Sequence, residues 1–379
     1  MKSYQLARRD LLAAGGLGIG LAAAITSAKT QVAAPAPAAE GTIWSQEYWA
    51  QKGSVKLSLF RKRLGAPTAG AQPLPVLFLV HGSSLSARSS YDLGVPDGGT
   101  YSFMDVFARN GFDVWTMDHD GYGHSGSSGN NSDIMSGVED LKAATPLVLA
   151  ETGRSKLHFF GASSGSIRAA AFAQLMPERV DRLVLAASTY KGEGAAEIQR
   201  RRDRIGELRA HPRRKRDATM IRSIFTRDGH PSIYDPLMIE ALVAAEMKFG
   251  DTIPAGTYVD MAVNLPLVDP AKVTSPVLMT RGEWDGNSTD DDLLDFFRQL
   301  GTVTANTSFF QIRHTARAST RIASCCGTRC RISSLLRPRL RPDARVGASH
   351  GASRRQVYAV CASLTAFARK RANASPLHP

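Results

Sequence analysis

The sequence predicts an α/β fold in which a mainly parallel, twisted sheet is flanked by helices and carries a helical insertion. Short apolar runs alternate with helical patterns along most of the chain, which is typical of strands joined by helices. The runs are almost continuously apolar, as expected for strands that are buried on both faces. One interruption of roughly 85 charge-rich residues is too long for a simple crossover, so we expect a separate helical unit there.

Apolar runs bounded by turn residues or helical patterns mark the expected strands. In chain order they occupy residues 75–80, 112–117, 157–160, 180–187, 277–280 and 307–312. Segments 103–110 and 133–152 have the composition and spacing of helices, and another helix follows residue 163.

The long charged interruption is expected to form a helical cap or lid at residues 189–272. The core is then discontinuous, with residues 46–188 before the cap and residues 273–318 after it. Basic residues cluster between positions 200 and 216 of the cap. They are either a solvated helical face or a surface that steers an anionic substrate.

The N-terminus has the pattern of an export signal at residues 1–34. Arg8 and Arg9 precede an apolar, Gly/Ala-rich run that ends near Ile25, and small residues follow. The paired arginines resemble a twin-arginine signal, which indicates a periplasmic or secreted protein. The alternative is a membrane anchor, but an apolar run of about 15 residues is shorter than the ~20 that a span needs. We expect a linker at residues 35–45 and no stable membrane insertion after cleavage.

The net charge of +13 is concentrated at the C-terminal end of the chain. From Arg313 onward there are 14 Lys or Arg residues and one acidic residue, so the first 312 residues carry no net charge. All four cysteines also lie in this tail, at 325, 326, 330 and 361, in no standard zinc-binding spacing. We therefore expect no nucleic-acid partner, no metal and no cofactor.

A serine between two glycines follows the expected strand at 157–160. The turn contains Gly161, Ser163 and Gly165, and a helical pattern begins directly after it. A sharp strand-to-helix turn exposes the serine Oγ above the sheet edge, and the free N–H groups of the helix start face the site where negative charge develops. A Gly/Ser-rich turn without function is the alternative. The order of strand, turn and helix predicts that Ser163 is a nucleophile.

These residues resemble the α/β-hydrolase superfamily, in particular its serine esterases and lipases with a cap domain. His81, Gly82 and Ser83 follow the expected strand 75–80 and are similar to the family's oxyanion loop. The resemblance implies that the backbone N–H groups of Ser83 and Ser164 bind the oxyanion, and that His81 is structural. A Gly-rich segment at 118–126 matches a loop that shapes the pocket wall.

The resemblance also implies a triad acid and base after the last strands, in the order Ser, Asp, His. Asp285, which follows the strand 277–280, matches the family's acid best. Glu283 and the acidic run 290–292 are rivals, although acidic residues are also favoured at a helix start. His314 follows the strand 307–312 and is the expected base. The family usually has a small residue where Arg313 stands, and His350 is the weaker alternative.

The chain changes character after Ala318. Residues 319–379 are rich in Arg, Ser and Cys and lack the apolar period of the closing helix that the family resemblance implies. We hypothesise that this tail results from a shift of reading frame, which sequencing of the gene would test.

The sequence thus predicts an exported serine hydrolase that cleaves small-molecule carboxylic esters through an acyl-enzyme. Amide, peptide or lactone hydrolysis on the same triad is an alternative, because one machinery serves all acyl groups. An inactive binding protein on the same scaffold is another. Epoxide hydrolases resemble this pattern with Asp where Ser163 stands, which disfavours that reaction here.

Overall fold

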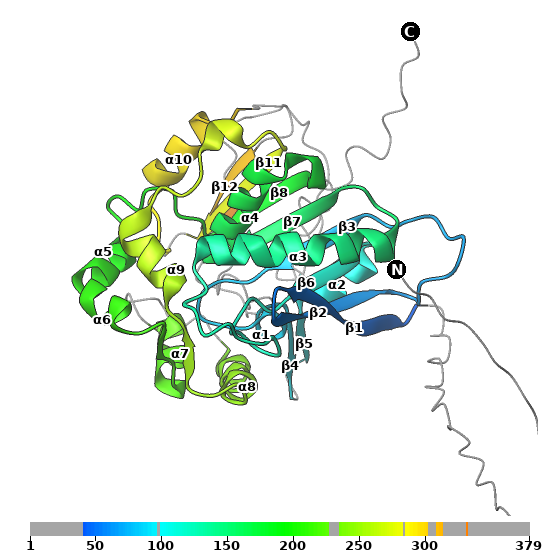
Figure 1. Cartoon of the computed structure of the whole chain (residues 1–379), viewed down its shortest axis with the longest axis horizontal. Helices are drawn as coiled ribbons and strands as arrows, with labels where there is room; N and C mark the ends of the chain where they lie inside the picture. The colour runs from blue at the N-terminus through cyan, green and yellow to red at the C-terminus, as the bar shows by residue number, and fades with distance from the viewer. Residues whose placement is uncertain are drawn as a thin grey trace, which may run out of the picture. The chain divides into compact units, whose positions relative to one another are not determined.

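The computed structural model describes residues 41–96, 99–226, 235–282, 285–301, 308–313 and 331–332 (Figure 1). The predicted signal peptide, His314, His350 and nearly all of the tail lie outside this range. Within it, no helix has the length and apolar character needed to cross a membrane.

A twisted sheet with the order β1-β2-β6-β3-β7-β8-β11-β12-β13 forms the centre of the described chain. The strands from β6 to β12 in this order run parallel, whereas β1, β2 and β13 pair antiparallel at the two sides. The predicted α/β architecture is therefore confirmed. The strand bounds are β1 (Ile43–Lys52), β2 (Val55–Leu64), β3 (Val76–Val80), β6 (Asp113–Met117), β7 (Leu157–Ala162), β8 (Val180–Ala186), β11 (Val277–Gly282), β12 (Ser308–Arg313) and β13 (Arg331–Ile332).

The two faces of the sheet bury different sets of helices (Figure 1). Helices α3 (Ile134–Thr152), α4 (Ser164–Leu175) and α10 (Asp290–Arg298) pack on one face. Helices α1 (Ala87–Tyr91) and α2 (Phe103–Arg109) pack on the other. Because both faces are covered, β3 and β6 are wholly buried and β7, β8 and β11 nearly so, which explains their nearly continuous apolar sequence.

Local signals fix where the core helices begin and end. The Asp133 carboxylate accepts a hydrogen bond from the backbone N–H of Ser136 at 2.7 Å and caps α3. The same helix ends at Gly153, which has a φ of 65° that a side chain would disfavour. Ser102 caps α2 in the same way, by accepting from the N–H of Asp105 at 2.9 Å.

Two antiparallel hairpins were not predicted. The β1–β2 hairpin begins at Ile43, inside the segment expected to be a linker. Half of β1 is exposed and only one of its residues is buried, so the strand lacks an apolar run. The second hairpin joins β4 (Asp92–Val95) to β5 (Gly99–Ser102).

The segment between β8 and β11, which we call the insert, is mainly helical. Its short strands β9 and β10, which are separated in the chain by α7 and α8, pair antiparallel, and α7 and α8 pack on residues of the β4–β5 hairpin, including Leu93 and Tyr101. The insert contains α5 (Ala196–Asp203), α6 (Ile205–Ala210), β9 (Arg213–Lys215), α7 (Ala218–Thr226), α8 (Pro236–Met247), β10 (Thr252–Pro254), α9 (Gly256–Val259) and the π-helix Asp260–Asn264.

Candidate active site

Ser163 lies at the sharp turn between β7 and α4. Its φ of 54° and ψ of −128° place a residue with a Cβ atom in a region that favours glycine. Such a conformation costs about 1–3 kcal/mol, and the surroundings must enforce it. The Ser163 N–H donates to the carbonyl of Ala186 at 2.9 Å, and its own carbonyl accepts from the N–H of Ser166 at 2.9 Å. The backbone at Ser163, the predicted nucleophile, is thus strained, and these two hydrogen bonds hold it in that conformation.

The two glycines of this turn are required by close backbone contacts. A Cβ atom on Gly161 would stand 2.3 Å from the carbonyl oxygen of Gly165. A Cβ atom on Gly165 would stand 2.2 Å from the carbonyl oxygen of Val80. Neither position has room for a methyl group, so the turn packs directly against the end of β3.

The loop after β3 lies beside the serine turn, because β3 and β7 are parallel neighbours with Val80 opposite Gly161. A Cβ atom on Gly82 would be 3.3 Å from the Cβ atom of Ser163, so the two residues are in contact. The Ser83 hydroxyl donates to the Ser164 hydroxyl at 2.8 Å. The structure therefore brings Ser83, Ser163 and Ser164 together.

The backbone N–H groups of Ser83 and Ser164 are available as donors. Among the described residues, neither N–H group donates to a carbonyl or a side chain. Ser164 is the first residue of α4, where a helix leaves its N–H groups unpaired. Two fixed donors beside a nucleophile can stabilise an oxyanion, each by about 3 kcal/mol.

Asp285 follows β11 at the carboxyl edge of the sheet, the edge at which Ser163 follows β7. Its Oδ1 accepts from the N–H of Asn287 at 2.9 Å, and its backbone carbonyl accepts from the Arg281 guanidinium at 3.0 Å. Burial raises the pKa of the Asp285 carboxyl, and the Asn287 hydrogen bonds oppose this rise. Hydrogen bonds from Asn287 thus hold the acid in one orientation, and within the described part of the chain its carboxylate forms no ion pair.

The rival acids have other roles or lie outside the described residues. The run Asp290–Arg298 forms α10, which begins with three acidic residues behind the N-cap Thr289. The Asp292 carboxylate accepts from the backbone N–H of Tyr190 at 2.9 Å and of Lys191 at 2.8 Å. Glu283 is outside the described residues. The helix start explains the acidic run.

The expected base, His314, is outside the described residues, but the strand before it is described. β12 ends at Arg313 and runs parallel to β11, with Ile312 opposite Gly282. The chain therefore leaves β12 at the same sheet edge at which it leaves β11. This topology is compatible with a base supplied from that edge.

His81 is buried and neutral. Burial and the neighbouring His119 lower the pKa of His81 to about 3. Its Nδ1–H donates to the carbonyl of Gly82 at 2.8 Å, and its Nε2 accepts from the N–H of His119 at 3.1 Å. The Nδ1 bond therefore stays within the loop after β3, and the Nε2 bond holds that loop to the loop after β6.

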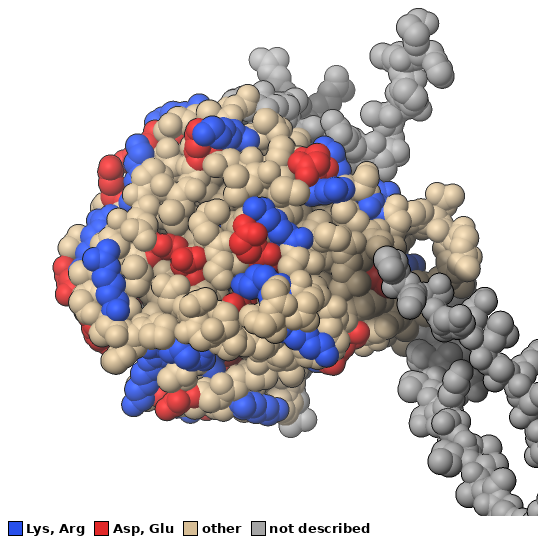
Figure 2. All heavy atoms as spheres, viewed as in Figure 1, with Lys and Arg blue, Asp and Glu red and all other residues tan. Residues whose placement is uncertain are grey.

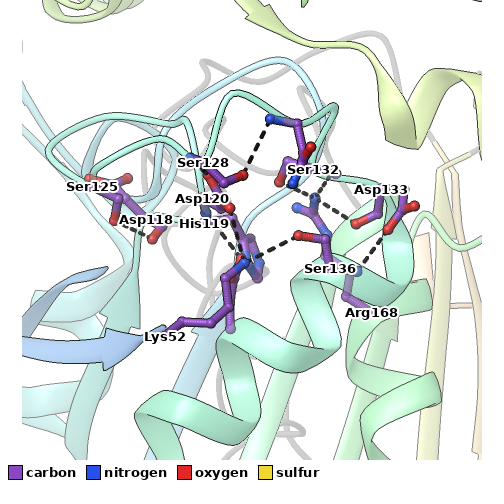
Figure 3. Close-up of polar contacts among 12 residues, drawn as sticks. Lys52, Asp118, His119, Asp120, Ser125, Ser128, Ser132, Asp133, Ser136 and Arg168 are labelled. Carbon is purple, nitrogen blue, oxygen red and sulfur yellow. Dashed lines mark hydrogen bonds and ion pairs between the residues drawn. The ribbon is translucent and has the colours of Figure 1, made fainter. Parts of the chain in front are cut away.

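A buried polar network braces the loop after β6 (Figure 3). His119 donates from Nδ1 to the Asp140 carboxylate at 2.9 Å, and burial lowers the pKa of His119 to about 4. Lys52 of β1 forms ion pairs with Asp140 and, at 3.1 Å, with Asp120. Because His119, Asp120 and Asp140 are buried and bonded to one another or to Lys52, we assign the network a structural role.

The insert contacts the oxyanion loop through residues that the sequence analysis did not identify. The Thr257 hydroxyl of α9 donates to the Ser83 hydroxyl at 2.8 Å, and the Tyr258 hydroxyl lies 2.7 Å from that of Ser84. The Glu246 carboxylate accepts from the N–H and the hydroxyl of Ser86, each at 2.7 Å. No sequence signal joins positions that are so far apart in the chain.

The arginines of the basic cluster form ion pairs but differ in their exposure. Arg200 and Arg204 are exposed and pair with Glu197 and Glu207. Arg216 is buried and pairs with Glu246. On the face shown in Figure 2, Lys and Arg side chains alternate with Asp and Glu side chains and form no surface of one charge. The described residues also contain no His, Cys, Asp and Glu cluster suited to a metal ion.

Comparisons with known proteins indicate a hydrolase. The sequence model of the family described as serine aminopeptidase, S33, matches residues 98–315, which is more than half of the chain. A curated 2-hydroxy-6-oxononadienedioate/2-hydroxy-6-oxononatrienedioate hydrolase from Paraburkholderia phymatum is 37% identical over 112 residues. The similarity covers 29% of this chain and only 34% of that enzyme.

Solved structures are similar to this chain at low sequence identity. A 2-hydroxy-6-oxo-6-phenylhexa-2,4-dienoate hydrolase from a Rhodococcus species is similar with a TM-score of 0.51 and 20% identity, over 72% of this chain and 92% of that one. An esterase from Thermogutta terrifontis is similar with a TM-score of 0.47 and 18% identity, over 71% of this chain and 90% of that one.

Proposed function

The chain belongs to the serine aminopeptidase S33 family of α/β-hydrolases, and from this premise we propose that it cleaves carboxylic esters through an acyl-enzyme on Ser163. The observation that carries the proposal is the strained serine at position 163, placed beside the N–H groups of Ser83 and Ser164, which have no acceptor among the described residues. A nucleophile next to two preorganised donors is suited to acyl transfer.

The proposed reaction has two halves. Ser163 Oγ attacks the ester carbonyl carbon while His314 takes the serine proton, and the N–H groups of Ser83 and Ser164 bind the oxyanion. His314 then gives that proton to the departing alkoxide, which leaves as an alcohol. Water attacks the acyl-enzyme with the same help from His314 and releases the acid. Asp285 holds the imidazole in one tautomer and stabilises its cation.

The insert is proposed to act as the cap that selects a small-molecule substrate, because it supplies residues that contact the oxyanion loop. We further propose that residues 1–34 direct export to the periplasm or beyond, on the basis of the paired Arg8 and Arg9 and the apolar run after them.

A second candidate activity is hydrolysis of a 2-hydroxy-6-oxo dienedioate. The observation that favours it is the 37% identity to the hydrolase from Paraburkholderia phymatum over 112 residues. Amide and lactone hydrolysis, and a binding role without catalysis, are alternatives on the same scaffold.

A fluorophosphonate probe tests the nucleophile directly. We expect the full chain to be labelled, and we expect Ser163→Ala to abolish labelling without changing the thermal unfolding temperature. A panel of p-nitrophenyl esters of increasing chain length, run beside a 2-hydroxy-6-oxo dienedioate, then separates the two candidate activities. Well-folded protein that the probe does not label would refute the catalytic proposal and favour a binding role.

A further inference from the structure

A buried chain of hydroxyl groups connects the insert to both oxyanion residues. Thr257 donates to the Ser83 hydroxyl at 2.8 Å, and Ser83 donates to the Ser164 hydroxyl at 2.8 Å. All three residues are buried, with exposed fractions of 0% for Thr257, 5% for Ser83 and 0% for Ser164. Hydrogen bonds in such surroundings are shielded from competition by water.

Ser83 is also held from a second side. The Tyr122 hydroxyl, in the loop after β6, donates to the backbone carbonyl of Ser83 at 3.0 Å. Burial raises the pKa of Tyr122 to about 12, so this hydroxyl keeps its proton and stays a donor at neutral pH. Ser83, which contributes one oxyanion N–H, is thus held at its carbonyl by a residue of the core and at its hydroxyl by a residue of the insert.

The start of α9 is itself fixed to the core, so Thr257 has a firm base. The N–H of Gly256 donates to the carbonyl of Asn131 at 2.8 Å, and a Cβ atom on Gly256 would stand 2.6 Å from the N atom of Asp133. A few residues later, the Asp260 carboxylate accepts from the N–H of Ile134 at 2.8 Å. Contacts on both sides of Thr257 tie it to the segment that begins α3.

We propose that Thr257 is a positioning residue of the oxyanion hole, which it acts on through Ser83. The inference rests on the proposed function, because it assigns a role to Thr257 in that same site. Since an oxyanion forms only during the reaction, the loss of the Thr257 hydroxyl should weaken transition-state binding more than substrate binding. The insert would then set the turnover number of the enzyme as well as its choice of substrate.

The test compares Thr257→Val, which removes the hydroxyl and keeps the shape, with Thr257→Ser, which keeps the hydroxyl. Thr145→Val is the matched control, because Thr145 is also buried and donates to a backbone carbonyl, that of Leu141, on α3. For each full-length protein we would measure kcat and KM on the best ester of the panel, the inhibition constant of a boronic acid that mimics the tetrahedral state, and the thermal unfolding temperature.

In Thr257→Val we expect kcat to fall by about fivefold with little change in KM. At a factor of ten per ~1.36 kcal/mol this corresponds to about 1 kcal/mol, the usual net value of one hydrogen bond. The boronic acid should bind more weakly by a similar factor. Thr257→Ser should recover most of both losses, and Thr145→Val should show neither. A Thr257→Val protein with unchanged kcat and unchanged boronic-acid affinity would overturn the inference, as would equal losses in Thr145→Val.

Two further readouts keep the test decisive. If Thr257→Val does not fold, Ser83→Ala removes the Thr257–Ser83 and Ser83–Ser164 hydrogen bonds while it keeps the oxyanion N–H, and its kcat should fall as well. Wild-type kcat in Ser83→Ala would overturn the inference. Fluorophosphonate labelling of the wild-type chain separates the two proposals. Without labelling the proposed function fails, whereas labelled wild type with an unaffected Thr257→Val contradicts only the role of Thr257.

Discussion

Gly165→Ala is the substitution for which the structure gives the clearest expected effect. The added Cβ atom would stand 2.2 Å from the carbonyl oxygen of Val80 and 2.5 Å from that of His81. Ordinary contact begins at 3.4 Å, so the serine turn and the end of β3 must separate by about 1.2 Å, the difference between 3.4 and 2.2 Å. Both neighbours are backbone atoms and cannot rotate away.

This separation falls between Ser163 and the loop that carries Ser83. A displacement of about 1 Å in an active site costs about 100-fold in rate, so we expect the fluorophosphonate labelling rate to fall by about that factor. Strain from overpacking should also lower the free energy of unfolding by about 1–3 kcal/mol, measured by urea denaturation of the full chain.

Gly206→Ala is the matched control for this experiment. Gly206 lies in α6, and a Cβ atom there would meet nothing within 4 Å. Alanine is favoured over glycine in a helix by about 1 kcal/mol, so this variant should label at the wild-type rate and be no less stable. A Gly165→Ala protein that labels as fast as the wild type would refute the argument from close packing.

Two further predictions concern stability. Glu246→Ala leaves the buried Arg216 guanidinium without its carboxylate, so we expect the free energy of unfolding in urea to fall by about 3–5 kcal/mol; Glu240→Ala breaks an exposed ion pair on the same helix, and an equal loss there would contradict the role of burial. The buried His119 and His81 have pKa values lowered from 6.5 to about 4 and about 3, so the unfolded chain binds more protons below pH 6.5. The free energy of unfolding should therefore be highest above pH 6.5 and fall by about 1.4 kcal/mol per pH unit for each histidine between pH 6.5 and 4. Urea denaturation at pH 7, 6 and 5 checks this, and a flat profile would show that these rings are not buried and neutral.

The parts of the site that are local in sequence could be predicted. The apolar run 157–160, the glycines at 161 and 165 and the following helix are neighbours in the chain, so their pattern predicted the turn that the structure contains at Ser163. The parallel sheet followed from the same kind of evidence, because strands buried on both faces must be almost wholly apolar.

The parts that depend on contacts across the fold could not be predicted. Thr257 and Ser83 are separated by 174 positions, and a threonine in a charged segment carries no sign of its partner. Which arginines of the basic cluster are buried could not be predicted either, since Arg216 is buried against Glu246 whereas Arg204 is exposed. The β1–β2 hairpin was missed because half of β1 is exposed and the strand has no apolar run.

The attachment of the insert limits how a substrate can enter. The Glu246 carboxylate accepts a hydrogen bond from Ser86, and the Thr257 hydroxyl donates one to Ser83. The side chains of Glu246 and Thr257 are both buried. A hinged lid that lifted as one body would have to break these bonds and expose the Arg216 charge. Entry should therefore depend on small movements within the insert, away from its anchors. An engineer who exchanges this insert for that of a relative would have to transplant the anchors together with their partners, or the turnover number would fall along with the specificity.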